Sequence, residues 1–316
     1  MKLQQLRYAL EVYRHNLNVS EAADALFTSQ PGISKQIRLL EEELGIQIFI
    51  RSGKRVVSVS QPGKAVLEIS ERILRDVQNI KNIGSEFTDH DSGSLTIATT
   101  HTQARYALPK IVAEFVKNYP KVNLTIKQGS PSAIAQMVSS GEADLAIITE
   151  RIDDHPELGK LPCYEWNHAV IVPHDHPLLD CRNPLSLEDL ALFPLVTYEF
   201  AFNSGSSIAR TFNKAHIEQP DVALSAADTD VLKTYVRLGL GVGLMAKMAY
   251  DPVVDQDLQL IDAAHLFEPS PTWIALRTDT YLRGYAYDFI QIFAPKLTRE
   301  VVDRILYTPV VEDFSI

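Results

Sequence analysis

Cysteine is scarce in this chain: its 316 residues include two, Cys163 and Cys181. Two cysteines form no disulfide framework and lack the spacing of a structural zinc site, so we expect reduced, structural thiols. Long apolar runs are absent as well, and no stretch approaches the length that spans a bilayer. The first residues also lack the charged-then-apolar pattern of a secretory leader. We therefore expect a cytoplasmic protein without a membrane partner.

Positive charge is in short supply, because 40 acidic residues outnumber 30 Lys and Arg and leave a net charge of −10. The deficit is unevenly distributed. Residues 1–60 hold eight Lys and Arg against six Asp and Glu, about +2, so the remainder carries about −12. An acidic body limits indiscriminate attachment to nucleic acid, so DNA binding by the N-terminal part requires a correct site and more than one basic head. The length indicates more than one domain.

The segment between Asn18 and Leu44 has the pattern of a helix-turn-helix, and a preceding helix over residues 3–14 supports it. The adjacent alanines Ala22 and Ala23 allow two helix backbones to cross closely. The preceding helix places apolar side chains at 3-4-3 spacing, which makes one stripe for burial. Its members are Leu3, Leu6, Leu10 and Tyr13.

The last helix of this segment has the features of a DNA-reading helix. Ser29 is placed as its N-cap, and Pro31 in the first turn loses only an N–H that has no intrahelical partner. One face is apolar and is expected to be buried, through Ile33, Ile37, Leu40 and Leu44. The opposite face carries donors suited to base edges and phosphates. The predicted DNA contacts on this segment are Ser29, Gln30, Pro31, Ser34, Lys35 and Arg38.

A basic β-hairpin is predicted over residues 49–58, turning at Ser52-Gly53. Three cations and no acid stand between Arg51 and Arg55. A basic wing beside a reading helix is expected to bind phosphates, here through Arg51, Lys54 and Arg55. An amphipathic helix trio without nucleic acid is the alternative. The small pair, the cap, the polar face and the wing together favour double-stranded DNA.

A long helix is predicted from Gln61 onward, with apolar side chains at 3-4-4-3 spacing. Its stripe consists of Val66, Ile69, Ile73, Val77 and Ile80. A helix between two domains has no core of its own, so the stripe predicts pairing with the same helix of a second chain. Packing against the body of its own chain is the alternative. Residues 88–93 then read as a flexible hinge.

Strands and helices alternate after the hinge, which predicts a βαβαβ unit with parallel strands and then a second unit. The fold class is therefore α+β multidomain, with an N-terminal winged helix-turn-helix, a long linker helix and a two-lobed α/β domain. These parts are expected over residues 1–60, 61–90 and 91–316. Lobe I is expected over about 91–163 and 269–316, and lobe II over about 164–268.

Polar side chains where the first strand of the α/β domain ends predict an anion site. Residues 99–103 offer hydroxyls, an amide and free backbone N–H groups without a fixed cation. Such a cradle suits a small oxyanion or carboxylate, such as sulfate or an acylated serine. Thr149 ends the third strand at the same edge, and Tyr164 and Trp166 are expected to form a wall near the lobe crossover. Ordinary helix-capping threonines are the alternative for Thr100 and Thr102.

Enzymatic motifs are weak. His174 and His176 alternate with other residues and lack a third ligand at metal spacing. The serines at 204–207 lack the G-x-S-x-G pattern, and the glycines at 239–243 precede a strand, unlike a dinucleotide fingerprint. We expect no catalytic residue, no metal and no cofactor.

The order of these parts resembles the LysR-type transcriptional regulators over the whole chain. The likeness is carried by AADALFTSQPGISKQIRLLEEELGIQIF at 22–49 and VRLGLGVGLMA at 236–246. In that family a winged helix-turn-helix is joined by a dimerising linker helix to an effector domain that is similar to periplasmic solute-binding proteins. Other segments resemble the branch that controls sulfur assimilation and cysteine synthesis. They are residues 99–106, 147–150, 164–168, 174–178 and 228–237.

This resemblance implies an inducer-responsive DNA-binding regulator with sulfate or N-acetylserine as effector. It also implies a homotetramer built from dimers, with RNA polymerase as a further partner. Asn203 stands where this branch carries a threonine, after Phe200-Ala201-Phe202. A regulator of sulfonate and sulfate-starvation genes and a non-catalytic solute carrier remain as alternatives. The predicted effector contacts are Thr100, Thr102, Gln103, Thr149, Tyr164, Trp166 and Asn203.

Overall fold

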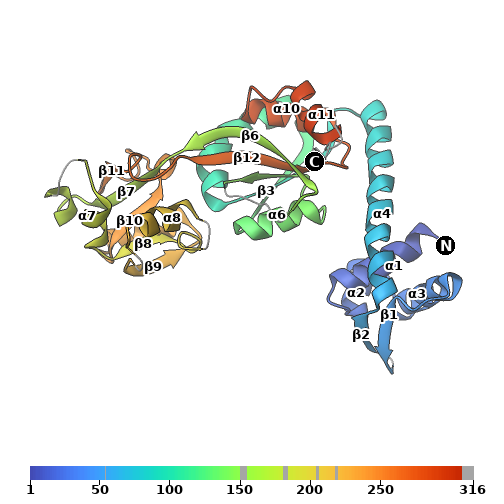
Figure 1. Cartoon of the computed structure of the whole chain (residues 1–316). Helices are drawn as coiled ribbons and strands as arrows, with labels where there is room; N and C mark the ends of the chain where they lie inside the picture. The colour runs from blue at the N-terminus through green and yellow to red at the C-terminus, as the bar shows by residue number, and fades with distance from the viewer. Residues whose placement is uncertain (54, 150–154, 181–183, 204–205, 218–219, 308–316) are drawn as a thin grey trace, which may run out of the picture. The chain divides into compact units, whose positions relative to one another are not determined.

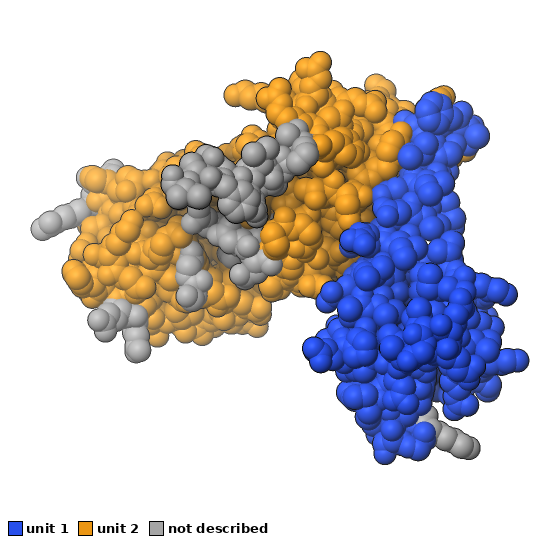
Figure 2. Space-filling model, turned by 45° about the vertical axis from the view of Figure 1, so that its right-hand side comes forward, with its two compact units in different colours: residues 1–88 blue, residues 89–316 orange. Residues whose placement is uncertain are grey.

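The computed structural model of the chain describes residues 1–53, 55–149, 155–180, 184–203, 206–217 and 220–307. It divides into two compact units, residues 1–88 and 89–316, which Figure 2 shows in blue and orange. The predicted fold class is confirmed: the first unit is a helical head with a hairpin and a long helix, and the second contains two five-stranded sheets (Figure 1). Among the described residues, no helix combines the length and the apolar character of a membrane span.

The head contains α1 (Leu3–Arg14), α2 (Val19–Ala25), α3 (Gln30–Leu44), β1 (Phe49–Ser52) and β2 (Arg55–Val59). Asn18 caps α2 by accepting hydrogen bonds from two backbone N–H groups, and Ser29 caps α3 through the N–H of Gly32. The predicted alanine pair is buried, as are Ile33, Ile37 and Leu40. The Ser29 cap and the small pair therefore act as the sequence predicts, and the Asn18 cap is an addition from the structure.

Three predicted core positions of the head are exposed: Leu3, Tyr13 and Leu44. The contact face of α1 is centred on Ala9, which is fully buried, so the period of the helix brings Val12 inward and turns Tyr13 to solvent. Leu44 lies in the last turn of α3 and is 38% exposed. The prediction for these three side chains is wrong, because spacing alone does not locate the centre of a stripe.

A buried carboxylate joins α3 to the wing. Glu41 Oε1 accepts hydrogen bonds from the backbone N–H groups of Ile48 at 2.9 Å and Phe49 at 3.0 Å. Its other oxygen, Oε2, pairs with Arg51 Nη1 at 2.8 Å. Buried backbone donors are costly when they lack an acceptor, so Glu41 fixes where the wing begins relative to the reading helix.

Replacing Glu41 with Ala is expected to destabilise the wing by about 3 kcal/mol, because two buried N–H groups and one cation lose their partner. Hydrogen exchange of the β1 amides measures this loss as about a hundredfold faster exchange. The Glu41→Gln variant keeps one acceptor oxygen and is expected to lose less, and the exposed neighbour Glu42→Ala is the control. Unchanged protection in Glu41→Ala contradicts the assignment.

Helix α4 (Gln61–Thr88) has two different parts. Near its start Leu67 is buried and Ile73 and Leu74 are partly buried in the core of the head. Farther on, Ile80 is 69% exposed and Phe87 is 78% exposed. The alternative of packing against the chain's own body therefore applies to the first part of the helix, and pairing with a second chain stays a prediction for the rest. The predicted hinge is shorter than expected, since α4 reaches Thr88 and the next strand begins at Ser92.

The first sheet of the second unit has the order β4-β3-β5-β12-β6. Its strands are β3 (Ser92–Thr99), β4 (Lys121–Gln128), β5 (Leu145–Ile148), β6 (Leu158–Trp166) and β12 (Ser270–Arg277). The predicted parallel unit is confirmed, because β3 is parallel to β4 and β5. Strand β12 lies antiparallel between β5 and β6. The helices α5 (Leu108–Asn118) and α10 (Gly284–Phe293) contribute to one apolar cluster with this sheet. The helix α6 (Pro131–Ser139) contributes to a second cluster. A further helix, α11 (Arg299–Tyr307), ends the described chain.

The second sheet has the order β11-β7-β10-β8-β9. Its strands are β7 (His168–Pro173), β8 (Leu195–Tyr198), β9 (Val222–Ala226), β10 (Val242–Ala246) and β11 (Leu258–Asp262). Its helices are α7 (Leu187–Ala191), α8 (Ser207–Lys214) and α9 (Thr229–Arg237). The chain enters this sheet between Trp166 and His168, and returns to the first sheet between Asp262 and Ser270. Figure 1 shows β6 and β12 side by side along this crossover.

Two of the glycines at 239–243, which the sequence does not identify as a dinucleotide fingerprint, have a packing reason. A Cβ on Gly241 would lie 2.2 Å from the carbonyl oxygen of Pro194, and one on Gly243 would lie 2.5 Å from Ile171 Cγ1. The backbone therefore approaches Pro194 too closely for a side chain at Gly241, just before β10 (Val242–Ala246), and a side chain at Gly243 would displace Ile171.

Cys163 is a free and half-buried thiol, and its Sγ donates to the carbonyl oxygen of Leu161 at 3.4 Å. Burial raises the pKa of this thiol to about 12, so it carries no thiolate at neutral pH. Cys163 is thus a structural residue, as expected. Cys181 lies outside the described residues.

Candidate DNA interface and effector site

Five of the predicted DNA contacts lie together on α3. They line a hollow of about 480 Å³ that Leu39 and Glu42 complete. The Gln30 amide donates to Ser34 Oγ at 3.2 Å, which orients it along the helix. The five residues are Gln30, Pro31, Ser34, Lys35 and Arg38. Donors gathered on one exposed helix face are what base-edge recognition requires.

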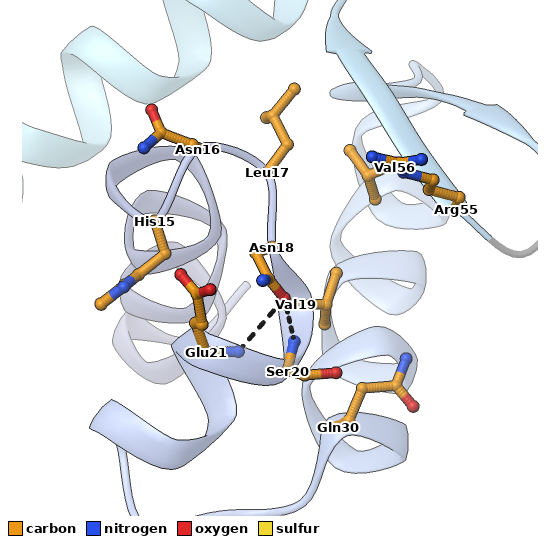
Figure 3. Close-up of a pocket in the computed structure, with 10 residues that line it drawn as sticks. All are labelled: His15, Asn16, Leu17, Asn18, Val19, Ser20, Glu21, Gln30, Arg55 and Val56. Carbon is orange, nitrogen blue, oxygen red and sulfur yellow. Dashed lines mark hydrogen bonds between the residues drawn. The ribbon is translucent and has the colours of Figure 1, made fainter.

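A second hollow, of about 460 Å³, lies between the reading helix and the wing (Figure 3). Gln30 of α3 and Arg55 of β2 line it, together with the turn between α1 and α2. Asn18 and Ser20 also border it, and sequence reasoning did not propose them as contacts. Asn16 and Leu17 in this turn have positive φ angles of 51° and 68°, which no local motif indicated.

The remaining predicted DNA contacts are placed differently. The Ser29 hydroxyl accepts the Gly32 N–H at 3.3 Å, so its acceptor function is engaged in capping. Arg51 is paired with Glu41 and positions the wing. Its contact with phosphate stays a prediction, as does that of Lys54, which lies outside the described residues.

Two variants are expected to distinguish a contact with base edges from a contact with phosphates. Gln30→Ala removes an amide placed for base edges and should reduce discrimination between operator and unrelated DNA by about 1–3 kcal/mol. Arg55→Ala should weaken binding to all duplexes and lower the salt dependence by about one phosphate contact. Fluorescence anisotropy over a salt series, with an operator selected in vitro, measures both. Arg7→Ala, an exposed cation on α1, is the control. Identical salt slopes for Arg55→Ala and wild type would contradict the assignment.

The predicted effector residues gather along one edge of the first sheet. Register places the end of β3 beside the end of β5, with Thr99 opposite Ile147. In the same way Ile148 of β5 lies opposite Trp273 of β12, and Thr272 lies opposite Tyr164 of β6. The edge therefore carries one hydroxyl in or directly after each of four strands, β3, β5, β12 and β6, namely Thr100, Thr149, Thr272 and Tyr164.

The centre of this edge is buried and uncharged. Thr100 is 8% exposed and Gln103 is 1% exposed. The Tyr164 hydroxyl donates to Gln103 Oε1 at 2.5 Å, which joins two predicted contacts from distant parts of the chain. Gln103 opens a π-helical turn, η1 (Gln103–Ala107), a conformation that is frequent at functional sites.

Thr102 has partners in the second sheet and its helices. Its Oγ1 lies 3.0 Å from Thr229 Oγ1 and 3.4 Å from the Tyr198 hydroxyl. Tyr198 and Thr229 are themselves hydrogen-bonded at 2.9 Å. Sequence reasoning did not propose these two residues, because nothing near them in the chain indicates a site. Thr102 thus joins the cradle to the second lobe.

Charged side chains surround this hydroxyl junction. His101 Nε2 pairs with Asp228 Oδ2 at 3.1 Å, and Arg105 Nε pairs with Asp230 Oδ2 at 2.9 Å. Although burial acts in the opposite direction, the Tyr106 hydroxyl and Arg105 lower the pKa of Asp230. Ligand atoms of His101, Asp228 and Asp230 lie within 4.8 Å of one another, but these pairs already use them. The cluster therefore joins the lobes.

Polar atoms without a partner stand beside the cradle. Among the described residues, Trp166 Nε1 and His168 Nδ1 are buried and make no hydrogen bond. The sequence indicated Trp166 but not His168. Burial lowers the pKa of His168 to about 4, so its imidazole is neutral at physiological pH.

Asn203 and Thr149 complete the predicted set. Thr149 is half-buried directly after β5, at the edge described above. Asn203 is exposed in the loop between β8 and α8, unlike the buried cradle residues Thr100 and Gln103. His174 and His176, the rejected metal pair, have separate partners in the Gln256 carbonyl and the Leu178 N–H.

The neutral state of His168 predicts a pH dependence of stability. The unfolded chain binds a proton on this residue below about pH 6.5, whereas the folded unit does so only near pH 4. Acidification therefore favours the unfolded state, and wild type should lose about 2 kcal/mol more than His168→Phe between pH 7.5 and 5. Urea unfolding followed by tryptophan fluorescence reports on the second unit, which holds both tryptophans. Equal losses in the two proteins would show that His168 is not desolvated.

The head presents a donor-rich helix face beside a basic wing, and the second unit presents an edge of buried, uncharged polar groups. This is the arrangement of a DNA-binding regulator with a ligand domain. The chain belongs to the LysR family of transcriptional regulators. The family described as "Bacterial regulatory helix-turn-helix protein, lysR family" matches residues 3–64, and "LysR substrate binding domain" matches residues 88–298.

Similar proteins of known sequence or structure agree with this membership. The transcriptional regulator SsuR of Burkholderia cenocepacia is 50% identical over 97% of this chain and 99% of its own length. The regulator CysB of Haemophilus influenzae is 52% identical over 96% of this chain and 93% of its own length. The crystal structure of the cofactor-binding domain of the Cbl regulator has a TM-score of 0.64 and 39% identity, and covers 69% of this chain and 95% of that domain.

Proposed function

We propose that this regulator controls genes of sulfur assimilation and cysteine synthesis, and that a small anionic effector sets its activity. The similarity to regulators named CysB, SsuR and Cbl over nearly the whole chain supports the pathway. The observation that supports an anionic effector is the row of buried, uncharged donors along the edge of the first sheet. Because its target is DNA, the regulator acts in the cytoplasm under this proposal.

The chemistry of the row favours a compact oxyanion or carboxylate. Hydroxyls and an amide stabilise an anion by hydrogen bonds alone, whereas a phosphate is usually met by Arg or Lys. The buried polar groups at the centre are Thr99, Thr100 and Gln103, none of them charged. The Thr99 hydroxyl already donates to the Ile147 carbonyl at 3.1 Å, which leaves Thr100 and Gln103 to the ligand. Sulfate and N-acetylserine are the effectors we propose.

Effector binding acts through the closure of the two lobes. A ligand that binds one arrangement of Gln103 more tightly than another shifts that equilibrium, and the adjacent Thr102 carries the shift to Tyr198 and Thr229. The exposed apolar residues of α4, including Ile80 and Phe87, pair with the same helix of a second chain. Paired heads read a two-fold operator, in a tetramer built from two dimers, with RNA polymerase as a further partner.

Removing one cradle donor is expected to weaken effector binding while sparing DNA binding. Thr100→Ala and Gln103→Ala should each raise the dissociation constant of the bound effector by about tenfold, since one hydrogen bond to an anion is lost. Calorimetry against sulfate, thiosulfate, adenylyl sulfate, N-acetylserine and O-acetylserine identifies the effector in wild type. Thr125→Ala and Gln136→Ala, at exposed positions of β4 and α6, are the matched controls. Wild-type affinity in both cradle variants would locate the site elsewhere.

Gel-shift assays separate the remaining alternatives. A regulator of cysteine synthesis should retard promoters of those genes, and a regulator of sulfonate use should prefer promoters of sulfonate genes. A solute carrier with an inactive head would retard neither selectively. The absence of any sequence-selective retardation would rule out the proposed function.

A further inference from the structure

A buried arginine holds the segment that follows the long helix α4. Arg283 is 8% exposed and lies directly before α10 in the second unit. Its Nη1 donates to the carbonyl oxygen of Ser92 at 2.8 Å, and its Nη2 donates to that of Asp89 at 2.5 Å. Asp89 is the first residue after α4, and Ser92 is the first of β3. One guanidinium thus binds both ends of the segment that separates the helix from the first sheet.

Tyr285 and Gly93 complete this contact. Arg283 Cζ lies 4.9 Å from the centre of the Tyr285 ring, whose hydroxyl donates to the carbonyl oxygen of Ser94 at 2.9 Å. Gly93 has a φ angle of +148°, and a Cβ there would lie 2.8 Å from both Arg283 Nη1 and the Tyr285 hydroxyl oxygen. Only glycine therefore allows both side chains to approach the backbone this closely. We call Arg283, Tyr285 and Gly93 the exit clamp.

The exit clamp is attached to the core of the ligand domain. Tyr285 is buried in the same apolar cluster as Leu95 and Ile97 of β3, together with other residues of α10. A planar guanidinium offers five donors in a fixed geometry, so it holds two carbonyl oxygens at one separation, unlike a single ammonium on a flexible stem. The clamp therefore restricts the segment that the sequence predicts as a flexible hinge.

We propose that Arg283 is a positioning residue that couples the ligand domain to the DNA-binding head. This inference rests on the proposed function and adds the element through which a change in the ligand domain reaches α4. A loose segment would absorb such a change, because a flexible chain lets the parts that it joins reorient independently. A segment bound at both ends by one buried side chain transmits the change instead, since it moves with β3 and α10.

The coupling between the two binding events tests this role directly. The operator affinity of the full chain is measured by fluorescence anisotropy with and without saturating N-acetyl-L-serine, and the ratio of the two affinities is the coupling factor. Arg283→Ala should reduce a coupling factor of about fivefold or more to less than about twofold. Its calorimetric affinity for N-acetyl-L-serine and its operator affinity without this probe should stay at the wild-type values. A merely structural role for Arg283 would lower those two affinities instead.

Three further variants separate the clamp from general effects of substitution. Arg283→Lys keeps the charge but not the two-pronged contact, so it should recover only part of the coupling. Gly93→Ala should lose coupling as Arg283→Ala does, because its methyl group displaces both side chains of the clamp. Arg299→Ala is the matched control, since Arg299 stacks over Tyr287 of α10 at 4.5 Å and pairs with Asp303 within α11. It should keep the wild-type coupling factor.

Local proteolysis provides a readout that does not depend on any effector. A protease specific for acidic residues should cleave after Asp89 and Asp91 about tenfold faster in Arg283→Ala than in wild type, because the segment opens more often. A wild-type coupling factor in both Arg283→Ala and Gly93→Ala overturns the positioning role, and so does unchanged cleavage. A wild-type protein whose operator affinity responds to neither N-acetyl-L-serine nor sulfate contradicts the proposed effectors themselves, a result distinct from failure of the clamp alone.

Discussion

The structure of the ligand domain depends on one hydrogen-bonded junction between uncharged groups. The Tyr198 hydroxyl lies at its centre, bonded to Thr229, to Thr102 and to the backbone N–H of Ala246. Thr102 precedes Gln103 in the chain, so the cradle and the joint between lobes share one short segment. Because one hydroxyl takes part in all three bonds, this junction ties the two lobes together in the arrangement that the structure shows.

An ionic layer beside this junction makes the segment rigid. Lys233 is buried and pairs with Asp255 at 2.6 Å, while its Nζ also lies 3.3 Å from the Tyr106 hydroxyl. Tyr106 in turn donates to Asp230 at 2.5 Å. A buried ion pair is costly to break on one side only, so the π-helical turn is attached to α9 through groups that move together. Uncharged donors face the proposed ligand, and the charges are satisfied within the protein.

Local signals explain why most of the head could be predicted. Asn18 and Ser29 are side-chain caps, and Gly53 lies at a positive φ angle in the predicted turn of the wing. Each acts within a few residues of its own position. The role of Arg51 could not be predicted in this way, because its partner Glu41 lies ten positions away on another element.

The ligand domain was predicted less completely. Its parallel strands follow from alternation, and Thr100 and Gln103 follow from the rule that sites form where such strands end. Strands β6 and β7 follow one another with Asn167 alone between them, so little punctuation marks the crossover. His168 and Thr229 lie beside the candidate site only because distant segments fold together. No short pattern in the sequence carries that information.

The reading helix has a charge gradient. Lys35 and Arg38 line the hollow on α3, but Glu42, one turn farther on, lines it too. A polyanion is attracted by the first turns of such a helix and repelled by the last. The charge on this face thus favours approach of a polyanion to the opening turns of the helix over approach to its last turn.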